Sequence, residues 1–205
     1  MSLIEQPQNA RSRRTVAALL RAARELIEGE GFATLTMAAV AERAGVSRRA
    51  VYLHFATRTD LLRALYRNLG RTDDLARSLQ AVWDCPDAGT ALTEWAEHIV
   101  RSHPRILGII RAVERGRYTD PDAAELWQTA QGNWLKGSRR LMGWLADDGR
   151  LAARWTVDTA ADMMWALMSI DLLDRLLNER RWSRRRVAEH LAALFHATFV
   201  GPPPT

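Results

Sequence analysis

The chain has 205 residues, of which 47% are hydrophobic and 26% are charged, with a net charge of +5 and one cysteine, Cys85. This apolar content excludes a wholly disordered chain, and a single cysteine excludes both an intramolecular disulfide and a cluster of thiolate ligands. No run of 18 uncharged apolar residues occurs, so we expect no membrane-spanning helix and a cytoplasmic protein.

The positive charge is concentrated in the first third of the chain. Residues 1–70 contain 11 arginines and six acidic residues, whereas residues 71–205 contain 18 basic and 18 acidic residues. A basic module joined to a neutral one is typical of a nucleic-acid-binding protein with a second domain. A solvated basic face would give the same composition, so charge alone does not decide between the two.

Apolar spacing predicts helices along the first third of the chain, and no segment shows the sustained period of two that a strand requires. A polar tail over residues 1–10 precedes an amphipathic helix over 14–28, which Gly29 and Gly31 end. The elements that follow are a helix over 37–44 capped by Thr36, the turn Gly45-Val46, a helix from Ser47 to Phe55, and a helix that begins at the capping box of Thr57 and Asp60.

Longer helices are expected beyond residue 71, so we predict an all-α protein. Pro104 should end one helix and begin another, and Pro121 suits the first turn of a long one. The expected ranges are 89–102, 104–116, 121–146, 157–179 and 184–200, with a tail over 201–205.

Two short helices joined by a tight glycine turn predict a helix-turn-helix over residues 36–55. Its second helix would enter the DNA major groove by its N-terminal end, where Arg48 and Arg49 could reach base edges or phosphates. Val51 and Phe55 are four residues apart and should face inward. The expected DNA-contacting residues are Thr36, Met37, Ser47, Arg48, Arg49, Ala50, Tyr52, His54 and Arg58.

The segment GFATLTMAAVAERAGVSRRAVYLHFATRTDLLRAL, residues 31–65, closely resembles the DNA-binding region of TetR-family transcriptional regulators. The shared features are Gly followed by an aromatic residue, a capping Thr, Ala-Glu-x-Ala-Gly-Val-Ser, an aliphatic-Tyr-x-His-Phe run, and a basic residue before Leu-Leu. Two positions depart from the usual pattern, because Arg49 stands where a small residue is frequent and Arg58 where lysine is frequent. We expect Arg49 to alter which bases are read.

The resemblance implies a two-domain regulator. Residues 11–70 would form the N-terminal three-helix DNA-binding domain, and residues 71–200 would form a C-terminal helical bundle that binds a small-molecule effector and dimerises. The helix over 157–179 is apolar on nearly every face, as a dimer contact requires. A helix buried within one monomer would have the same pattern. The expected interface residues are Trp165, Leu172, Leu176, Leu191, Leu194 and Phe195.

A seam of Trp127, Trp134 and Trp144, with small residues between them, could line an apolar effector pocket or could equally be core. Asp171 lies in the most apolar helix, where a buried carboxylate would need a partner. The candidate effector-binding residues are His98, Arg111, Glu114, Trp127, Trp134 and Asp171, with His103 as a further polar group. The effector itself should be largely apolar.

We therefore expect a homodimeric transcriptional regulator that is a repressor released from a palindromic double-stranded DNA operator by a small-molecule effector, although activation remains open. No catalytic motif occurs in the C-terminal half, and the histidine spacings do not suit a metal, so neither an enzyme nor a cofactor is expected. The alternatives are a helical enzyme attached to a DNA-binding module, and an architectural DNA-binding protein whose second domain has a solid core.

Overall fold

The computed structural model describes residues 10–70 and 73–202, and it confirms the all-α prediction. Within these ranges the one β feature is an isolated antiparallel bridge between Leu151 and Val200. No described helix combines the length and hydrophobicity needed to cross a membrane. The predicted N-terminal tail lies outside the described residues except for Ala10, and so does the predicted C-terminal tail after residue 202.

The chain divides into two compact units. Unit 1 comprises residues 1–70 and 108–127, and unit 2 comprises residues 71–107 and 128–205. Two long helices, α6 (Ala88–Gly116) and α7 (Pro121–Asp147), each contribute one end to unit 1 and the remainder to unit 2. Unit 1 is therefore larger than the predicted DNA-binding domain, because residues 108–127 pack with the first 70.

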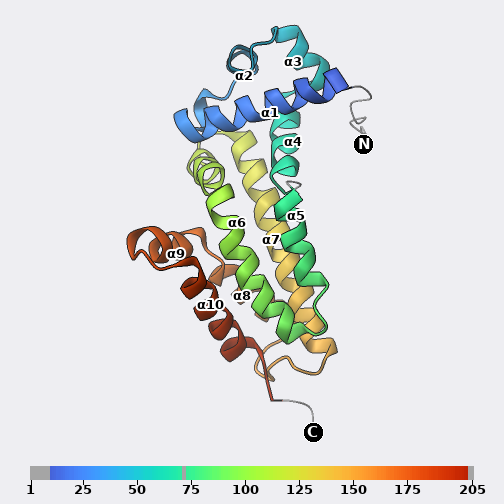
Figure 1. Ribbon diagram of the computed structural model, residues 1–205, viewed down its shortest axis with the longest axis vertical. Helices are drawn as coiled ribbons and strands as arrows, with labels where there is room; N and C mark the ends of the chain where they lie inside the picture. The colour runs from blue at the N-terminus through green and yellow to red at the C-terminus, as the bar shows by residue number, and fades with distance from the viewer. Residues whose placement is uncertain (1–9, 71–72, 203–205) are drawn as a thin grey trace. The chain divides into compact units, whose positions relative to one another are not determined.

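Unit 1 is built on α1, against which α2 and α4 pack (Figure 1). Its elements are α1 (Ala10–Glu30), the 3-10 turn η1 (Phe32–Thr34), α2 (Met37–Arg43), α3 (Arg48–His54), α4 (Arg58–Gly70) and the adjoining ends of α6 and α7. Every helix contributes apolar side chains to one core, which includes Leu19, Leu26, Ile27, Phe32, Leu35, Val40, Val51, Phe55, Leu61, Leu65, Ile109, Val113 and Leu126.

Backbone hydrogen bonds fix the turn between α2 and α3. The amide of Gly45 donates to the Glu42 carbonyl and the amide of Val46 donates to the Ala41 carbonyl, each at 3.0 Å. This Schellman pattern requires a left-handed residue after the helix, and Gly45 has a φ of 67°. The turn of the predicted helix-turn-helix is therefore fixed by residues within a few positions of one another.

Arg58, the first residue of α4, connects that helix to the start of α7. Its Nη2 donates to Oδ2 of Asp120 at 2.5 Å, its Nε lies 3.3 Å from Oδ2 of Asp122, and its guanidinium stacks over the Phe32 ring. Oδ1 of Asp120 accepts the amides of Asp122 and Ala123 and so caps α7. Both carboxylate oxygens of Asp120 therefore accept hydrogen bonds.

Unit 2 contains three helical segments that run side by side, from α5 (Asp73–Trp83), α6 and α7 (Figure 1). The Trp83 ring on α5 lies 5.7 Å from that of Trp95 on α6, and the guanidinium of Arg140 on α7 stacks over Trp83 at 3.8 Å. The remaining elements of this unit, in chain order, are α8 (Val157–Leu167), α9 (Ile170–Asp174), the π-helical turn η2 (Arg175–Glu179) and α10 (Arg184–Phe199).

The first helix begins at Ala10, earlier than the predicted residue 14, and two boundaries inside predicted helices also differ. Pro104 does not end a helix but lies inside α6, which continues because apolar residues on both sides of it, such as Val100 and Ile109, are buried. The predicted helix over 157–179 is interrupted at residues 168 and 169. Residues two apart on a helix face directions about 200° apart, and the break allows both Met168 and Ile170 to be buried.

A glycine allows two helices of unit 2 to approach closely. A Cβ atom on Gly137 of α7 would lie 2.6 Å from Cη2 of Trp95, which is shorter than any normal contact. The tryptophan seam predicted on α7 therefore includes Gly137, whose lack of a side chain leaves room for the Trp95 ring of α6.

We predict that Gly137→Ala destabilises the protein by about 1–2 kcal/mol, because overpacking of about 1–3 kcal/mol outweighs the helix propensity gained by alanine. Gly132→Ala is the matched control, since it changes the same helix where a Cβ would meet nothing within 4 Å. It should stabilise by up to about 1 kcal/mol. Urea unfolding measures both, and equal effects would contradict the close approach.

A second prediction concerns Asp120. Burial opposes ionisation of this carboxyl, but hydrogen bonds from Arg58 and from the Ala123 and Asp122 amides, with the Arg58 charge, lower its pKa. The ionised form therefore stabilises the fold above the unfolded pKa of about 3.9, and this stabilisation is lost as the pH falls through the lower folded pKa. Asp120→Asn keeps the capping oxygen and removes the charge.

We expect this substitution to lower the free energy of unfolding by about 1–2 kcal/mol at pH 7, a value between those of exposed and buried ion pairs. The loss should become progressively smaller below about pH 4. Asp147→Asn, at the exposed end of α7, is the control and should change little. Chemical unfolding at a series of pH values makes the measurement. A cost that does not depend on pH would show that the ion pair does not contribute.

Candidate nucleic-acid interface

Side-chain caps position the two short helices of the helix-turn-helix. Oγ1 of Thr36 accepts the amide of Ala39 at 3.1 Å at the start of α2, and Oγ of Ser47 accepts the amide of Ala50 at 3.2 Å at the start of α3. The caps leave other first-turn amides at the N-terminus of α3. A helix N-terminus of this kind favours a phosphate group.

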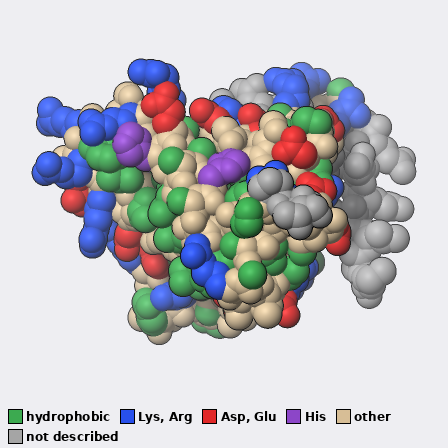
Figure 2. Space-filling model, turned by 90° about the horizontal axis from the view of Figure 1, so that it is seen from below, with side chains coloured by type: hydrophobic (Ala, Val, Ile, Leu, Met, Phe, Trp, Pro, Cys, Tyr) green, Lys and Arg blue, Asp and Glu red, His purple; other side chains and the backbone are tan. Residues whose placement is uncertain are grey.

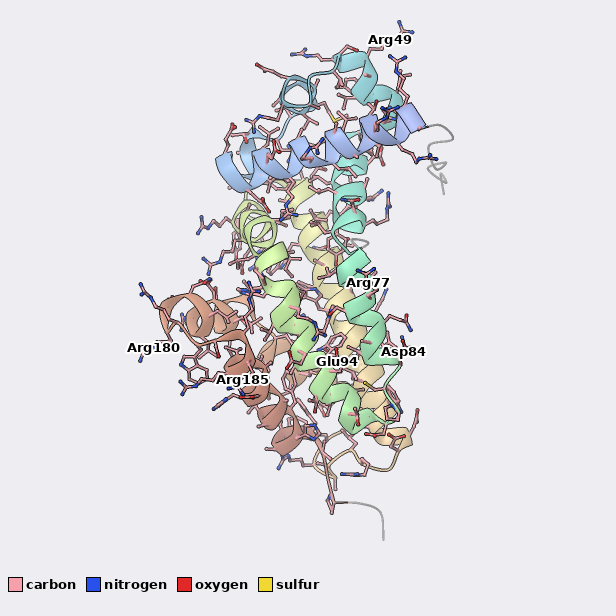
Figure 3. All side chains as sticks on the ribbon, viewed as in Figure 1. Arg49, Arg77, Asp84, Glu94, Arg180 and Arg185 are labelled. Carbon is pink, nitrogen blue, oxygen red and sulfur yellow. The ribbon has the colours of Figure 1, made fainter. Side chains whose placement is uncertain are left out.

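The outward face of α3 carries large side chains. Val51 and Phe55 are buried as predicted, so the residues between them face outward. Tyr52 is 56% exposed and Leu53 is 74% exposed. Arg49 extends from α3 into solvent (Figure 3), and Arg48 is exposed beside it.

The electrostatic environment of α3 is positive. Residues 43–59 contain no aspartate or glutamate, and neither Arg48 nor Arg49 forms an ion pair with any described residue. The guanidinium of Arg43, by contrast, bonds to Oε1 of Glu30 at 2.5 Å. The cations of α3 are therefore available for an external anion.

Two of the expected DNA-contacting residues are engaged elsewhere. Met37 is only 9% exposed and packs into the core of unit 1, because it occupies the inward side of the first turn of α2. Arg58 is paired with Asp120 and Asp122, so its guanidinium faces α7. The remaining expected contacts lie on or beside α2 and α3: Thr36, Ser47, Arg48, Arg49, Ala50, Tyr52 and His54.

Leu53 is a candidate contact that the sequence interpretation missed. Its side chain is the most exposed large apolar group on α3. The inward assignment of Val51 and Phe55 already implied that Leu53 faces outward, and an apolar residue there suits contact with a thymine methyl group.

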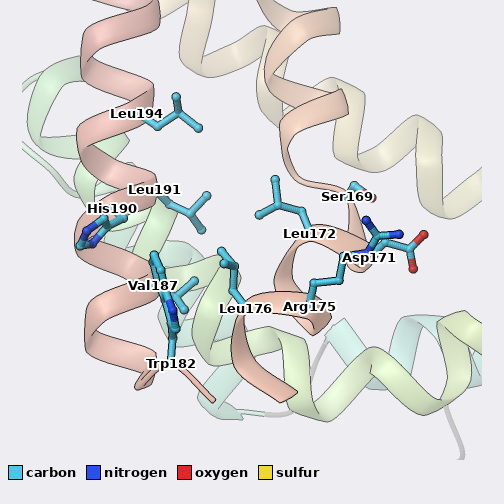
Figure 4. Close-up of a pocket in the computed structure, with 10 residues that line it drawn as sticks. All are labelled: Ser169, Asp171, Leu172, Arg175, Leu176, Trp182, Val187, His190, Leu191 and Leu194. Atoms are coloured by element: carbon cyan, nitrogen blue, oxygen red, sulfur yellow. The ribbon is translucent and has the colours of Figure 1, made fainter. Parts of the chain in front are cut away.

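An apolar groove lies in unit 2 between α9, η2 and α10. Figure 4 shows Leu172 and Leu176 facing Leu191 and Leu194 across it. Its volume is about 580 Å³. Ser169, Asp171, Leu172, Arg175, Leu176, Trp182, Val187, His190, Leu191 and Leu194 line it.

The structure separates the predicted interface residues into three groups. Leu172, Leu176, Leu191 and Leu194 meet in this groove. Phe195 is fully buried in the core of unit 2, because it lies one residue from Leu194 and so about 100° around the helix. Trp165, on α8, is outside the groove, and its indole Nε1 donates to Oε1 of Gln131 at 2.8 Å.

Exposed arginines are concentrated between η2 and the first turn of α10, and one of them, Arg175, lines the groove. Basic side chains gather at one end of the view in Figure 2, and the exposed arginines from η2 to the first turn of α10 are Arg175, Arg180, Arg181, Arg184, Arg185 and Arg186. Arg185 pairs with Glu189 at 3.0 Å, and the guanidinium of Arg186 stacks over Trp182 at 4.1 Å. An apolar centre with a charged border is the usual organisation of a protein interface.

The predicted effector residues are not brought together. His98 and Trp134 line a separate cavity in unit 2 of about 80 Å³. Arg111, Glu114 and Trp127 belong to unit 1, where the guanidinium of Arg117 stacks over Trp127. Asp171 is exposed at the groove and is not a buried carboxylate, because the break before α9 turns it outward.

Comparisons with known proteins agree with this geometry. Residues 19–65 match the family model described as bacterial regulatory proteins, tetR family. The Pseudomonas putida protein named Probable HTH-type transcriptional regulator ArpR is 29% identical over 185 residues, which cover 82% of this chain and 87% of the relative. The HTH-type transcriptional regulator TtgR, also of Pseudomonas putida, is 40% identical over 68 residues, covering 33% and 32% of the two chains.

The fold has solved counterparts. NalD of Pseudomonas aeruginosa, described as the secondary repressor of the MexAB-OprM multidrug efflux pump, aligns with a TM-score of 0.70 at 22% identity, over 93% of this chain and 98% of NalD. At that identity the likeness establishes the fold alone. The matched segment contains the capped helices, the glycine turn and the outward-facing cations of α3, so over residues 19–65 the chain is similar to the tetR family of bacterial regulatory proteins.

Proposed function

We propose that this transcriptional regulator is a repressor that binds a palindromic DNA operator as a homodimer and is released by a small-molecule effector. The observation that carries the proposal is the outward face of α3, where Arg48 and Arg49 lie beside a helix N-terminus without a carboxylate partner among the described residues. The names of the relatives ArpR and TtgR as transcriptional regulators support a regulatory role.

The two helices of the helix-turn-helix have different roles in this proposal. The N-terminal end of α3 enters the major groove, where Arg48 and Arg49 reach base edges and Ala50 permits close approach. Thr36, Ser47, Tyr52 and His54 orient the protein on the phosphate backbone. Arg58 is assigned to the connection with α7 rather than to a phosphate, because two carboxylates already surround it.

Dimerisation would use the groove of α9, η2 and α10. Leu194 is 40% exposed at its edge, and Leu172, Leu176 and Leu191 form its apolar centre. A second copy related by a twofold axis would cover the same residues on both chains. Such a dimer presents two copies of α3, which matches two half-sites about one DNA turn apart.

The effector would act through helices that both units share. α6 provides residues 95–106 to the smaller cavity of unit 2 and residues 108–116 to unit 1. A ligand that binds one arrangement of α6 more tightly than another shifts the population toward that arrangement. The presence of this cavity favours a ligand-responsive regulator over an architectural DNA-binding protein.

Selection of binding sites from random duplex DNA tests the proposal. We expect the purified protein to enrich a palindrome with half-sites about 10 base pairs apart. Arg48→Ala should relax the preference at particular base pairs by about 1–3 kcal/mol each, because it removes a bidentate contact to guanine.

Arg21→Ala is the matched control, since it removes the same charge from the exposed side of α1 and should leave the selected motif unchanged. If Arg48→Ala weakens binding equally to every DNA sequence, Arg48 contacts a phosphate and not a base. Salt-sensitive binding without any enriched motif would instead favour the architectural alternative.

Leu194→Glu tests the dimer. A carboxylate at the edge of the groove would be buried without a partner in the dimer, so we expect monomers at micromolar concentration and at least tenfold weaker operator binding. Leu79→Glu on α5, which is 36% exposed, is the matched control and should remain dimeric. Analytical ultracentrifugation gives the oligomeric state, and an intact Leu194→Glu dimer would place the interface elsewhere.

A further inference from the structure

The smaller cavity of unit 2 is lined by apolar side chains, one serine and two histidines. It is lined by α6, α7 and the segment from the end of α8 to α9, and its lining residues are Trp95, His98, Ile99, Ser102, His103, Ile106, Trp134, Met168, Ile170 and Leu173. None of these ten residues is acidic, lysine or arginine. A charged ligand would therefore lose its hydration without a counter-ion in the wall.

Two polar groups of the wall already have partners inside the protein. Nε1 of Trp95 donates to Sδ of Met168 at 2.9 Å, and Oγ of Ser102 donates to the carbonyl of Ile99 at 2.9 Å. The indole and the serine hydroxyl therefore hold their protons in internal hydrogen bonds. The wall they form is effectively apolar and, through Trp95 and Trp134, aromatic.

A chain of hydrogen bonds from Arg101 through Ser78 reaches Nδ1 of His98. Nε of Arg101 donates to Oγ of Ser78 at 2.9 Å, and the same Oγ lies 2.9 Å from Nδ1 of His98. Arginine can only donate, so the serine oxygen accepts from Arg101, which leaves the serine hydrogen available to Nδ1 of His98. With Nδ1 as the acceptor, a neutral His98 carries its proton on Nε2.

The environment also keeps His98 neutral. Burial, reinforced by the positive charge of Arg101, lowers the pKa of His98 to about 4. At neutral pH the ring therefore offers a hydrogen-bond donor without a charge, whereas a histidinium would attract an anion.

We propose that this cavity binds an uncharged, mostly aromatic molecule that has a hydrogen-bond acceptor, and that the acceptor is bound by Nε2–H of His98. The inference rests on the proposed effector response and defines the chemical class of the effector. The cavity of about 80 Å³ is smaller than the roughly 150 Å³ cavity that binds benzene. A one-ring ligand must therefore enlarge it by displacing part of its wall.

Three probes of similar shape test the ligand class by calorimetry on the full chain. Acetophenone has a ring and a neutral carbonyl acceptor, ethylbenzene lacks the acceptor, and benzoate has a charge. We expect acetophenone to bind about 3- to 10-fold more tightly than ethylbenzene because of one hydrogen bond. Benzoate should bind at least 100-fold more weakly than acetophenone. Tighter binding of benzoate, or no binding of either neutral probe, would overturn the proposal.

His98→Phe keeps a ring in the wall and removes the donor. We expect it to reduce the affinity for acetophenone to that for ethylbenzene, whose own affinity should not fall. His196→Phe, on α10 and outside the walls of both the cavity and the groove, is the matched control and should leave the ratio of the two affinities unchanged. If the His98→Phe variant keeps the same preference for acetophenone over ethylbenzene as the unmodified protein, His98 does not bind the acceptor.

Ser78→Ala tests the tautomer separately from folding and affinity. The ¹⁵N spectrum of the imidazole should show a proton on Nε2 of His98 in the unmodified protein and a mixture of tautomers in the variant. A proton on Nδ1 in the unmodified protein would contradict the assignment of the donor.

Operator binding is measured independently with the same probes. Acetophenone that binds in the calorimeter and weakens operator binding supports both proposals. Binding in the calorimeter without any change in operator affinity would keep the chemistry of the cavity and contradict the effector response.

Discussion

The pairing of Arg58 with Asp120 and Asp122 is the interaction on which the organisation of unit 1 depends. It joins residues more than 60 positions apart, at the point where α4 and α7 both begin. Asp120 caps α7 with one oxygen and binds Arg58 with the other, so the starting position of α7 and the position of α4 are fixed by one carboxylate. Hydrophobic contacts alone would permit small sliding movements that this geometry does not.

This connection matters for regulation because of the short distance along the chain from Arg58 to α3. Only residues 55–57 separate His54, the last residue of α3, from the first residue of α4. A displacement of α7 would have to stretch the ion pair or move α4, and a movement of α4 changes the position of the recognition helix. If the effector acts as we propose, residues 108–127 are where its influence reaches the DNA-binding helices.

Local signals made most of unit 1 predictable. The caps Thr36 and Ser47 and the Gly45 turn involve residues within a few positions of one another, and a single sequence contains that information. The partners of Arg58 depend on tertiary packing and were not predictable. For the same reason the sequence could not separate Phe195 in the core from Leu194 in the groove, since both suit an apolar helix, and it could not predict the break that exposes Asp171.

The concentration of arginine in the first third of the chain has a consequence for where the protein resides in a cell. Attraction to phosphates depends on counter-ion release and not on the spacing between two recognition helices. A repressor that loses its operator because this spacing changes would retain that attraction, since residues 43–59 contain no acidic group to oppose it. Release would then transfer the protein to other sites along the chromosome rather than to free solution. The response would reverse quickly, because the search for the operator would begin from DNA that is already bound.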